Sequence, residues 1–147
     1  MKKSKRMALI RRLAVQTEKK QAVLLGQAQQ KLNREHLQLE QLEQYLSSYN
    51  DQTENWSHTH ISSQTLQEFS SFIVQLKHAI GEQNKNIGLV RQHLNAQKKR
   101  WIDSNNKVKI IDKYIEKLVK NETRLESRQE QQMIEDLISN YGSQGWK

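Results

Sequence analysis

The chain has 147 residues, of which 35% are hydrophobic and 27% charged, with a net charge of +8 and neither Pro nor Cys. This low apolar content disfavours a thick globular core. It favours helices that pair along one narrow row of apolar residues, here called the seam. The absence of Cys excludes a disulfide scaffold and a thiolate metal site. No apolar run approaches the ~20 residues that span a membrane, and Arg11 and Arg12 interrupt the apolar stretch that a secretory signal needs.

A first helix is predicted over residues 7–49. Its seam residues are spaced by alternating steps of three and four, which return to one helix face. The predicted seam is Met7, Ile10, Ala14, Thr17, Gln21, Leu24, Ala28, Leu32, Glu35, Leu39, Leu42, Leu46 and Tyr49. Two steps of four fall together at Leu24, Ala28 and Leu32, and such a stutter locally unwinds a supercoil.

A polar connection is predicted over residues 50–64, because Asn, Asp, Ser and Thr compete with the helix for backbone hydrogen bonds. Ser62 or Ser63 is a suitable N-cap for the next helix. His58 and His60 form the only close histidine pair in the chain. We interpret them as ordinary loop residues rather than metal ligands, since no further ligand set surrounds them.

A second, longer helix is predicted over residues 65–138. Fourteen of the eighteen seam positions between Leu66 and Leu125 are apolar. The helix of about 70 residues would span roughly 110 Å. Gly81 and Gly88 interrupt it and mark either a close approach or flexibility. Residues 140–147 are predicted to form a disordered tail.

The chain is therefore predicted to be all-α, a single antiparallel two-helix coiled coil whose second helix is the longer one. With the fold-back near residue 58 or 59, the numbers of facing residues sum to about 118. In this register Leu42 faces Leu76, and nothing within the chain faces the second helix beyond about residue 112. The exposed continuation of the seam is predicted to fray or to be covered by another protein.

The positive charge predicts an acidic partner, which could be a nucleic acid, an anionic membrane surface or an acidic protein. Met1–Arg12 holds six Lys and Arg residues and no acid. The remaining charges are interspersed and are typical of the solvated faces of a coiled coil.

No catalytic chemistry is predicted. The chain contains no Gly-rich phosphate loop, nucleophile elbow or HExxH motif. A two-helix coil also lacks a concave pocket that excludes water. We therefore expect a non-enzyme that uses no cofactor and no metal.

An aromatic stripe beside the seam is the one surface feature that stands out. Two sets of residues share the spacing i, i+4, i+7, i+11, and the predicted register brings them to one face. The stripe comprises Gln38, Leu42, Tyr45 and Tyr49 with Phe72, Leu76, Ala79 and Gln83. It forms either an exposed binding patch or a set of rings that fold over the seam and broaden the core.

These residues resemble those of the FliJ family, small proteins of the bacterial flagellar type III export apparatus. The resemblance covers essentially the whole chain. It is carried by the basic start (Lys5-Arg6-Met7 and Arg11-Arg12-Leu13-Ala14), by Leu39 to Tyr45 with Tyr49, by Phe69 to Ile73 with Leu76, Ala79 and Gln83, and by Lys99-Arg100-Trp101.

The resemblance implies a stalk-like hairpin that inserts the end formed by its termini into the hexameric export ATPase ring (FliI). The aromatic stripe would bind the cytoplasmic part of the export gate (FlhA), with Gln83 the position where the family varies. Export chaperones would be further partners. The implied location is the cytoplasmic face of the inner membrane at the flagellar basal body, without insertion into the membrane and without a nucleic-acid partner.

The ATPase contact has no residue motif of its own. We assign it to the basic start and the apolar continuation of the second helix, namely Lys2, Lys3, Lys5, Arg6, Arg11, Arg12, Ile115 and Leu118. Two other functions remain open from the residues alone: nucleic-acid binding through the basic N-terminus, and a purely structural coiled-coil oligomer.

Overall fold

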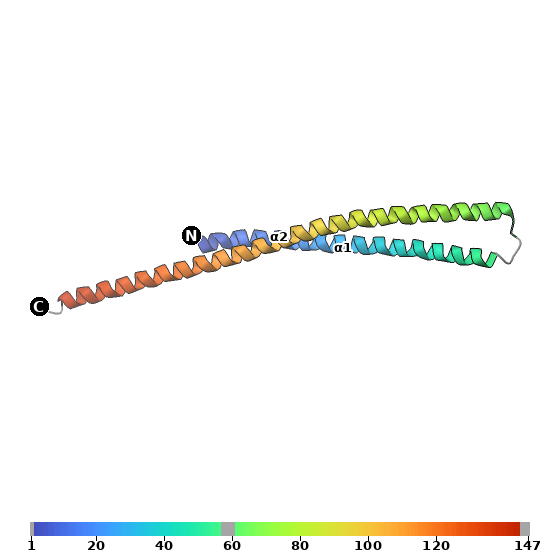
Figure 1. Cartoon of the computed structure of the whole chain (residues 1–147). Coiled ribbons are helices and arrows are strands. Elements are labelled where there is room, and N and C mark those ends of the chain that lie inside the picture. Colours follow the sequence, from blue (N-terminus) through green and yellow to red (C-terminus); the bar gives the residue numbers. More distant parts are fainter. Residues whose placement is uncertain (1, 57–60, 145–147) are drawn as a thin grey trace. The chain divides into compact units, whose positions relative to one another are not determined.

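A computed structural model describes residues 2–56 and 61–144, with side chains up to residue 142. It contains two helices, α1 (Lys3–Trp56, 54 residues) and α2 (Ser63–Gln144, 82 residues), and no strand among the described residues (Figure 1). The prediction of an all-α hairpin with a longer second helix is confirmed.

The connection between the helices is shorter than predicted, because α1 continues to Trp56 instead of ending near Tyr49. No Pro or Gly interrupts it, and the Thr53 hydroxyl donates to the Tyr49 carbonyl at 2.7 Å within the helix. The Trp56 ring also packs on Phe69, with centroids 4.2 Å apart. The pair His58 and His60 lies outside the described residues.

Ser62 caps the start of α2, as the sequence indicated. The Thr65 N–H donates to the Ser62 Oγ at 3.2 Å and satisfies one of the free donors of the first turn. At its other end α2 continues to Gln144, where a disordered tail was predicted from residue 140. Gly142 does not adopt a positive φ and so does not end the helix.

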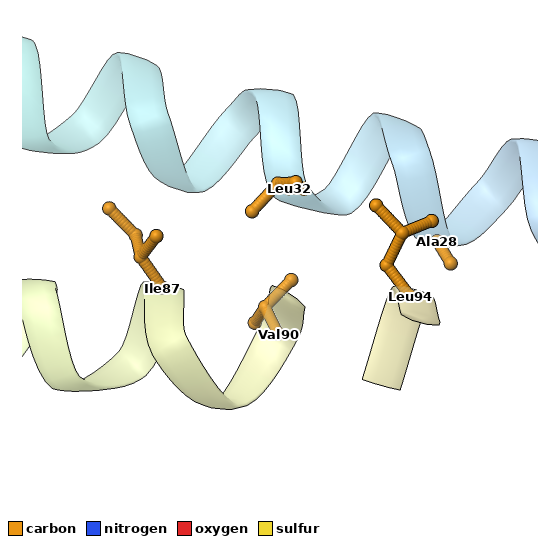
Figure 2. Packing of buried hydrophobic residues seen from close by; sticks show 5 residues of the cluster. All are labelled: Ala28, Leu32, Ile87, Val90 and Leu94. Carbon is orange, nitrogen blue, oxygen red and sulfur yellow. The ribbon is translucent and has the colours of Figure 1, made fainter. Parts of the chain in front are cut away.

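The contacts divide the chain into two compact units, which are described separately. Unit 1 comprises Met1–Lys19 and Ile102–Lys147, and unit 2 comprises Lys20–Trp101. The core of unit 2 is a cluster of buried aliphatic side chains from both helices, onto which Leu25 and Leu39 pack. Figure 2 shows this cluster, made of Ala28, Leu32, Ile87, Val90 and Leu94.

The register of unit 2 agrees with the predicted sum of about 118. Gln97 Nε2 donates to the Gln21 side chain at 2.6 Å and to its carbonyl at 3.3 Å. Gln83 Nε2 donates to the Glu35 carboxylate at 2.7 Å and to its carbonyl at 2.9 Å. Both pairs of numbers sum to 118, so two polar layers lie in the seam where the sequence placed facing residues.

The seam of α1 lies in a different phase from the one predicted for its first half. Leu25 packs on the core of unit 2, whereas Leu24 is 45% exposed. With Leu25 in the seam, the steps through Gln21, Leu25, Ala28 and Leu32 alternate four, three, four, and the predicted stutter disappears. The phase without a stutter is the one observed, because the buried residues of α2 also follow regular steps of three and four over the same length.

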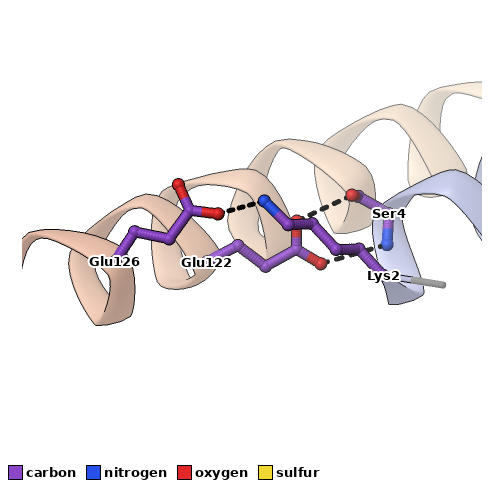
Figure 3. A network of polar contacts seen from close by, with 4 residues as sticks. All are labelled: Lys2, Ser4, Glu122 and Glu126. Atoms are coloured by element: carbon purple, nitrogen blue, oxygen red, sulfur yellow. Dashed lines mark hydrogen bonds and ion pairs between the residues drawn. The ribbon is translucent and has the colours of Figure 1, made fainter. Parts of the chain in front are cut away.

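In unit 1 the start of α1 is capped by α2 (Figure 3). The backbone N–H and the hydroxyl of Ser4 donate to the Glu122 carboxylate at 3.2 and 2.7 Å, and Lys2 pairs with Glu126. A carboxylate at a helix N-terminus satisfies free N–H groups and interacts favourably with the helix dipole. Helical side chains lean towards the N-terminus of their helix, so these glutamates reach back along α2.

This capping corrects the predicted start of the overhang at about residue 112. Ile115 and Leu118 are half-buried, and contacts with α1 extend to Glu126. The overhang is therefore shorter than predicted. One reason is that α1 begins at Lys3 rather than at Met7. The other is that the numbers of paired residues no longer sum to 118 in unit 1, but to 123 for Arg11 and Asp112 and to 126 for Ser4 and Glu122. Beyond Glu126, the large apolar side chains of α2 are exposed.

Gly81 and Gly88 do not mark a close approach. A Cβ added at either position would meet nothing within 4 Å. Of the two interpretations that the sequence left open, the close approach is wrong.

Candidate interaction surfaces

The aromatic stripe of unit 2 is partly exposed. Tyr45 is 60% exposed and Phe72 is 43% exposed, and Gln38 is also exposed. Leu42, Tyr49 and Ala79 are half-buried. Tyr45 comes directly before the seam residue Leu46, and Phe72 directly before Ile73, so both flank the seam rather than fill it.

Tyr49 anchors the stripe. Its ring packs against Phe69 with centroids 4.9 Å apart and against Phe72 at 4.8 Å, both in tilted arrangements. Such pairs stabilise beyond the area they bury. Trp56 extends the cluster on the other side of Phe69. In the predicted register, in which facing numbers sum to about 118, Tyr45 would lie near Phe72, but the ring that packs on Phe72 is that of Tyr49.

Two members of the predicted stripe lie in the seam. Leu76 is 7% exposed and Gln83 is 8% exposed. The side-chain amide of Gln83 donates to the Glu35 carboxylate, and Asn86 donates to the same carboxylate at 2.9 Å. Both residues support the surface from below and offer little area of their own to a partner.

The basic start of α1 is partly neutralised within unit 1. Lys2 pairs with Glu126 and Arg11 with Asp112. The hydrogen bond that Lys2 donates to Glu126 raises the pKa of Lys2, and the hydrogen bond that Arg11 donates to Asp112 raises the pKa of Arg11. The hydrogen bond from Ser4 lowers the pKa of Glu122. Lys3, Lys5 and Arg12 are exposed, and Arg6 has a polar interaction of its own.

The overhang of α2 presents its apolar residues on a face of their own. A seam continued from Glu122 in steps of three and four would pass through Leu125, Gln129, Gln132 and Asp136, which is mostly polar. The exposed apolar side chains that follow it lie out of this phase: Met133, Ile134, Leu137, Ile138 and Tyr141. A helix that simply prolonged α1 would therefore miss this face.

Unit 2 carries a basic band that was not predicted. Much of the excess positive charge was expected at the N-terminus. Residues 20–34 of α1 hold three Lys and Arg residues and residues 83–101 of α2 hold five, with no Asp or Glu in either segment. These eight cations equal the net charge of the whole chain. The register brings the two segments together, and the signal that could have found them is the shared lack of acids.

No metal centre is found among the described residues. No group of three or more His, Cys, Asp or Glu side chains there could hold a metal ion. Within the same residues, neither helix has an apolar stretch long enough to cross a membrane. The hollows between the helices are open grooves along the coiled coil, which suit the docking of another chain.

A protein-family comparison matches residues 2–142 to the family described as Flagellar FliJ protein. Searches among curated proteins and among solved structures gave no significant match. The family match covers all but the last five residues and the first.

Proposed function

Because this chain belongs to the FliJ family and is thus a component of the flagellar export apparatus, we propose that it acts there as a non-enzymatic, stalk-like coupling protein. One end, in unit 1, binds the hexameric export ATPase (FliI). The aromatic stripe in unit 2 binds the cytoplasmic part of the export gate (FlhA). Through these contacts it promotes protein export, escorts export chaperones and works at the cytoplasmic face of the inner membrane.

The exposure of Tyr45 and Phe72 is the observation that supports gate binding most directly. Large aromatic side chains with one open face are typical anchors of protein interfaces. Tyr49 packs on Phe72, and Phe69 packs on Tyr49 in turn, so the anchor is ordered before binding. The accessible members of the surface are Gln38, Leu42, Tyr45, Tyr49, Phe72 and Ala79, with Leu76 and Gln83 beneath them.

The double variant Tyr45→Ala/Phe72→Ala tests this surface. It should weaken binding to the purified gate domain by at least about tenfold, since interface aromatics commonly contribute 2 kcal/mol or more. Swimming motility should fall with it. The matched control is Leu37→Ala/Val74→Ala, which removes two equally exposed apolar side chains away from the stripe.

A large loss of helicity in the Tyr45→Ala/Phe72→Ala protein would assign the two rings to folding. Equal loss of gate binding in the control would remove the specificity that the proposal requires. Binding and circular dichroism measured on the same samples separate these results.

Binding to the ATPase ring is supported by the composition of unit 1. The exposed cations Lys3, Lys5 and Arg12 lie at the start of α1, and the overhang of α2 carries an exposed apolar face. Basic residues steer a protein towards an acidic pore, and the apolar face supplies area to bury once it is inside. The half-buried Ile115 and Leu118 stabilise the helix pair at this end.

Charge reversal tests this contact without disturbing the fold. Lys3→Glu/Lys5→Glu/Arg12→Glu changes three cations for which no ion pair is found among the described residues, and it leaves the pairs of Lys2 and Arg11 intact. We expect it to lower hexamer formation and ATP hydrolysis by the export ATPase. The control Lys77→Glu/Lys98→Glu/Lys99→Glu introduces the same charge in unit 2, and an equal effect there would contradict the assignment.

A further inference from the structure

One side of the helix pair in unit 2 carries both the aromatic stripe and a row of cations. The residues on this side come directly before a seam residue in each helix, as Lys31 precedes Leu32 and Arg100 precedes Trp101. Positions of this kind in two antiparallel helices flank the seam on the same side. The contact of Asn86 with Glu35 lies on this side, which we call the groove side.

Two adjoining grooves run along the groove side beyond the stripe. One, of about 360 Å³, is lined by Leu24, Lys31, Arg34 and His93, with Ala28 and Gln97 in its floor. The other, of about 180 Å³, shares Ala28, Lys31 and His93 and adds Leu89 and Val90. Because they share three residues, they form a single channel, whose floor holds the apolar Ala28 and Val90 beside the polar Gln97.

The channel is rimmed by cations without carboxylate partners. Lys31 and Arg34 line the channel, and Arg100 lies on the same side of the helix pair beyond its end. No ion pair involves any of these three cations among the described residues. The flanking segments 20–34 and 83–101 contain no acid at all. Elsewhere in coiled coils, such flanking cations usually face a Glu of the opposite helix. Here the opposite segment of the hairpin offers no carboxylate, so these cations are available to a carboxylate of another protein.

We propose that this channel is the docking site for an acidic amphipathic helix of a partner protein, which packs on α1 and α2 as a third helix. The apolar residues of that helix would lie over Ala28 and Val90. Its carboxylates would pair with Lys31 and Arg34 in the channel and with Arg100 beyond the end of the channel. From Leu24 to Arg34 the channel offers about 15 Å, or roughly three helical turns. This surface is separate from the gate and ATPase contacts proposed above.

A helix suits this site better than a nucleic acid or a membrane does. Phosphate backbones are bound by polar side chains and seldom require an apolar floor. A lipid surface would contact a helix that is apolar along its whole outer face, whereas here single apolar residues such as Leu37 and Val74 are scattered among polar ones. The juxtaposition of an apolar floor with charged rims is the usual pattern for binding a helix in a groove.

A synthetic peptide tests the inference: a helical 18-mer with Leu at seam positions and Glu on its flanks, labelled and titrated with the full-length chain by fluorescence anisotropy. The variant Lys31→Gln/Arg34→Gln/Arg100→Gln should weaken its binding by about tenfold. The control Lys77→Gln/Lys98→Gln/Lys99→Gln removes three cations away from the channel and should change binding less than about twofold.

Fluorescent labels at single introduced cysteines show where the peptide binds. The chain has no cysteine, so Gln27→Cys places a single label beside Lys31 and Gln92→Cys places one on the outer face of α2. Peptide should shift the fluorescence of the first label and leave the second unchanged. A shift of both labels by the same amount contradicts docking in the channel.

The other ligand classes are outcomes of the same assay. Random duplex DNA of matched charge and phosphatidylglycerol vesicles replace the peptide at 50 and 300 mM salt. Tighter binding of either one than of the peptide, equally reduced by both triple variants, would overturn the inference in favour of unspecific charge. So would failure of the peptide to bind at 50 mM salt. None of these results depends on the gate or the ATPase.

Discussion

Gln21 and Gln97 form a buried polar layer that explains how single residues fix the pairing of the two helices in unit 2. Gln97 is only 3% exposed and satisfies both hydrogens of its amide on Gln21. A buried polar group costs stability unless it is paired, and only one register pairs it. Such layers therefore select an alignment more than they stabilise it.

Substitutions in this layer should separate stability from specificity. Gln97→Ala should lower the free energy of unfolding by about 1–3 kcal/mol, because it removes the hydrogen bonds and leaves a small cavity. Gln21→Leu/Gln97→Leu should raise it, since an apolar pair needs no partner. Urea denaturation measures both. A double variant less stable than the single one would mean that the layer itself stabilises the hairpin.

Glu122 makes the stability of the first turns of α1 depend on pH. Its pKa is lower in the folded chain than in the unfolded one, because Ser4 donates two hydrogen bonds to the carboxylate. The stabilisation is thus present at neutral pH and is lost as the pH falls through the folded pKa.

Hydrogen exchange of the first turns of α1 should consequently become faster, relative to the core of unit 2, in acid than at neutral pH. Glu122→Gln should show fast exchange at both values, because the amide does not titrate. If the variant kept the same dependence on pH as the parent chain, another carboxylate would have to be responsible.

The choice between two adjacent leucines decides the seam of α1 as an element. Leu24 and Leu25 are equally apolar, but they point about 100° apart on the helix. The sequence of α1 alone favoured Leu24 and a stutter. The seam of α2, which has no stutter, selects Leu25 because both helices must stay in step to keep their side chains interlocked.

Gly81 and Gly88 lower the stability of α2, and substitution by Ala should restore it. Gly81→Ala and Gly88→Ala should each raise the free energy of unfolding by about 0.5–1 kcal/mol, because Ala is the better helix former and its Cβ meets no neighbour. Thermal melting followed by circular dichroism measures the gain. A loss of stability would indicate a contact made in an assembly or in solution.

At the scale of the whole molecule, the two units present different surfaces. Unit 2 holds the aromatic stripe, the basic channel and the best-buried core, and unit 1 holds the capped start of α1 and the overhang. In the described part of the chain the overhang has an exposed apolar face, so we expect its helix to gain stability when a partner covers that face.

Removal of residues 128–147 should therefore separate the two proposed contacts. The shortened chain should bind the gate domain and melt as the full-length chain does, because unit 2 keeps its core. It should lose most of its effect on ATPase hexamer formation. Circular dichroism and binding assays on the same preparation provide the control, and full ATPase stimulation by the shortened chain would exclude a role for the overhang.

The candidate sites were predictable to different degrees. Tyr45 and Phe72 were found from their spacing beside the seam, because period alone places a residue next to a buried face. The contact of Phe72 with Tyr49, and the burial of Leu76 and Gln83, required the partner helix. The basic channel required the register as well, since its lining residues come from two segments more than fifty residues apart in the chain.

By itself the sequence determined that the chain is two helices, that α2 keeps a regular seam and that facing residue numbers in unit 2 sum to about 118. These features follow from local periodicity and from the shortness of the connection. Only the tertiary structure decided which leucine of α1 is buried, how far α1 covers α2 and where the grooves lie. Each of these depends on side chains of both helices competing for one interface, and that competition is not encoded in either helix alone.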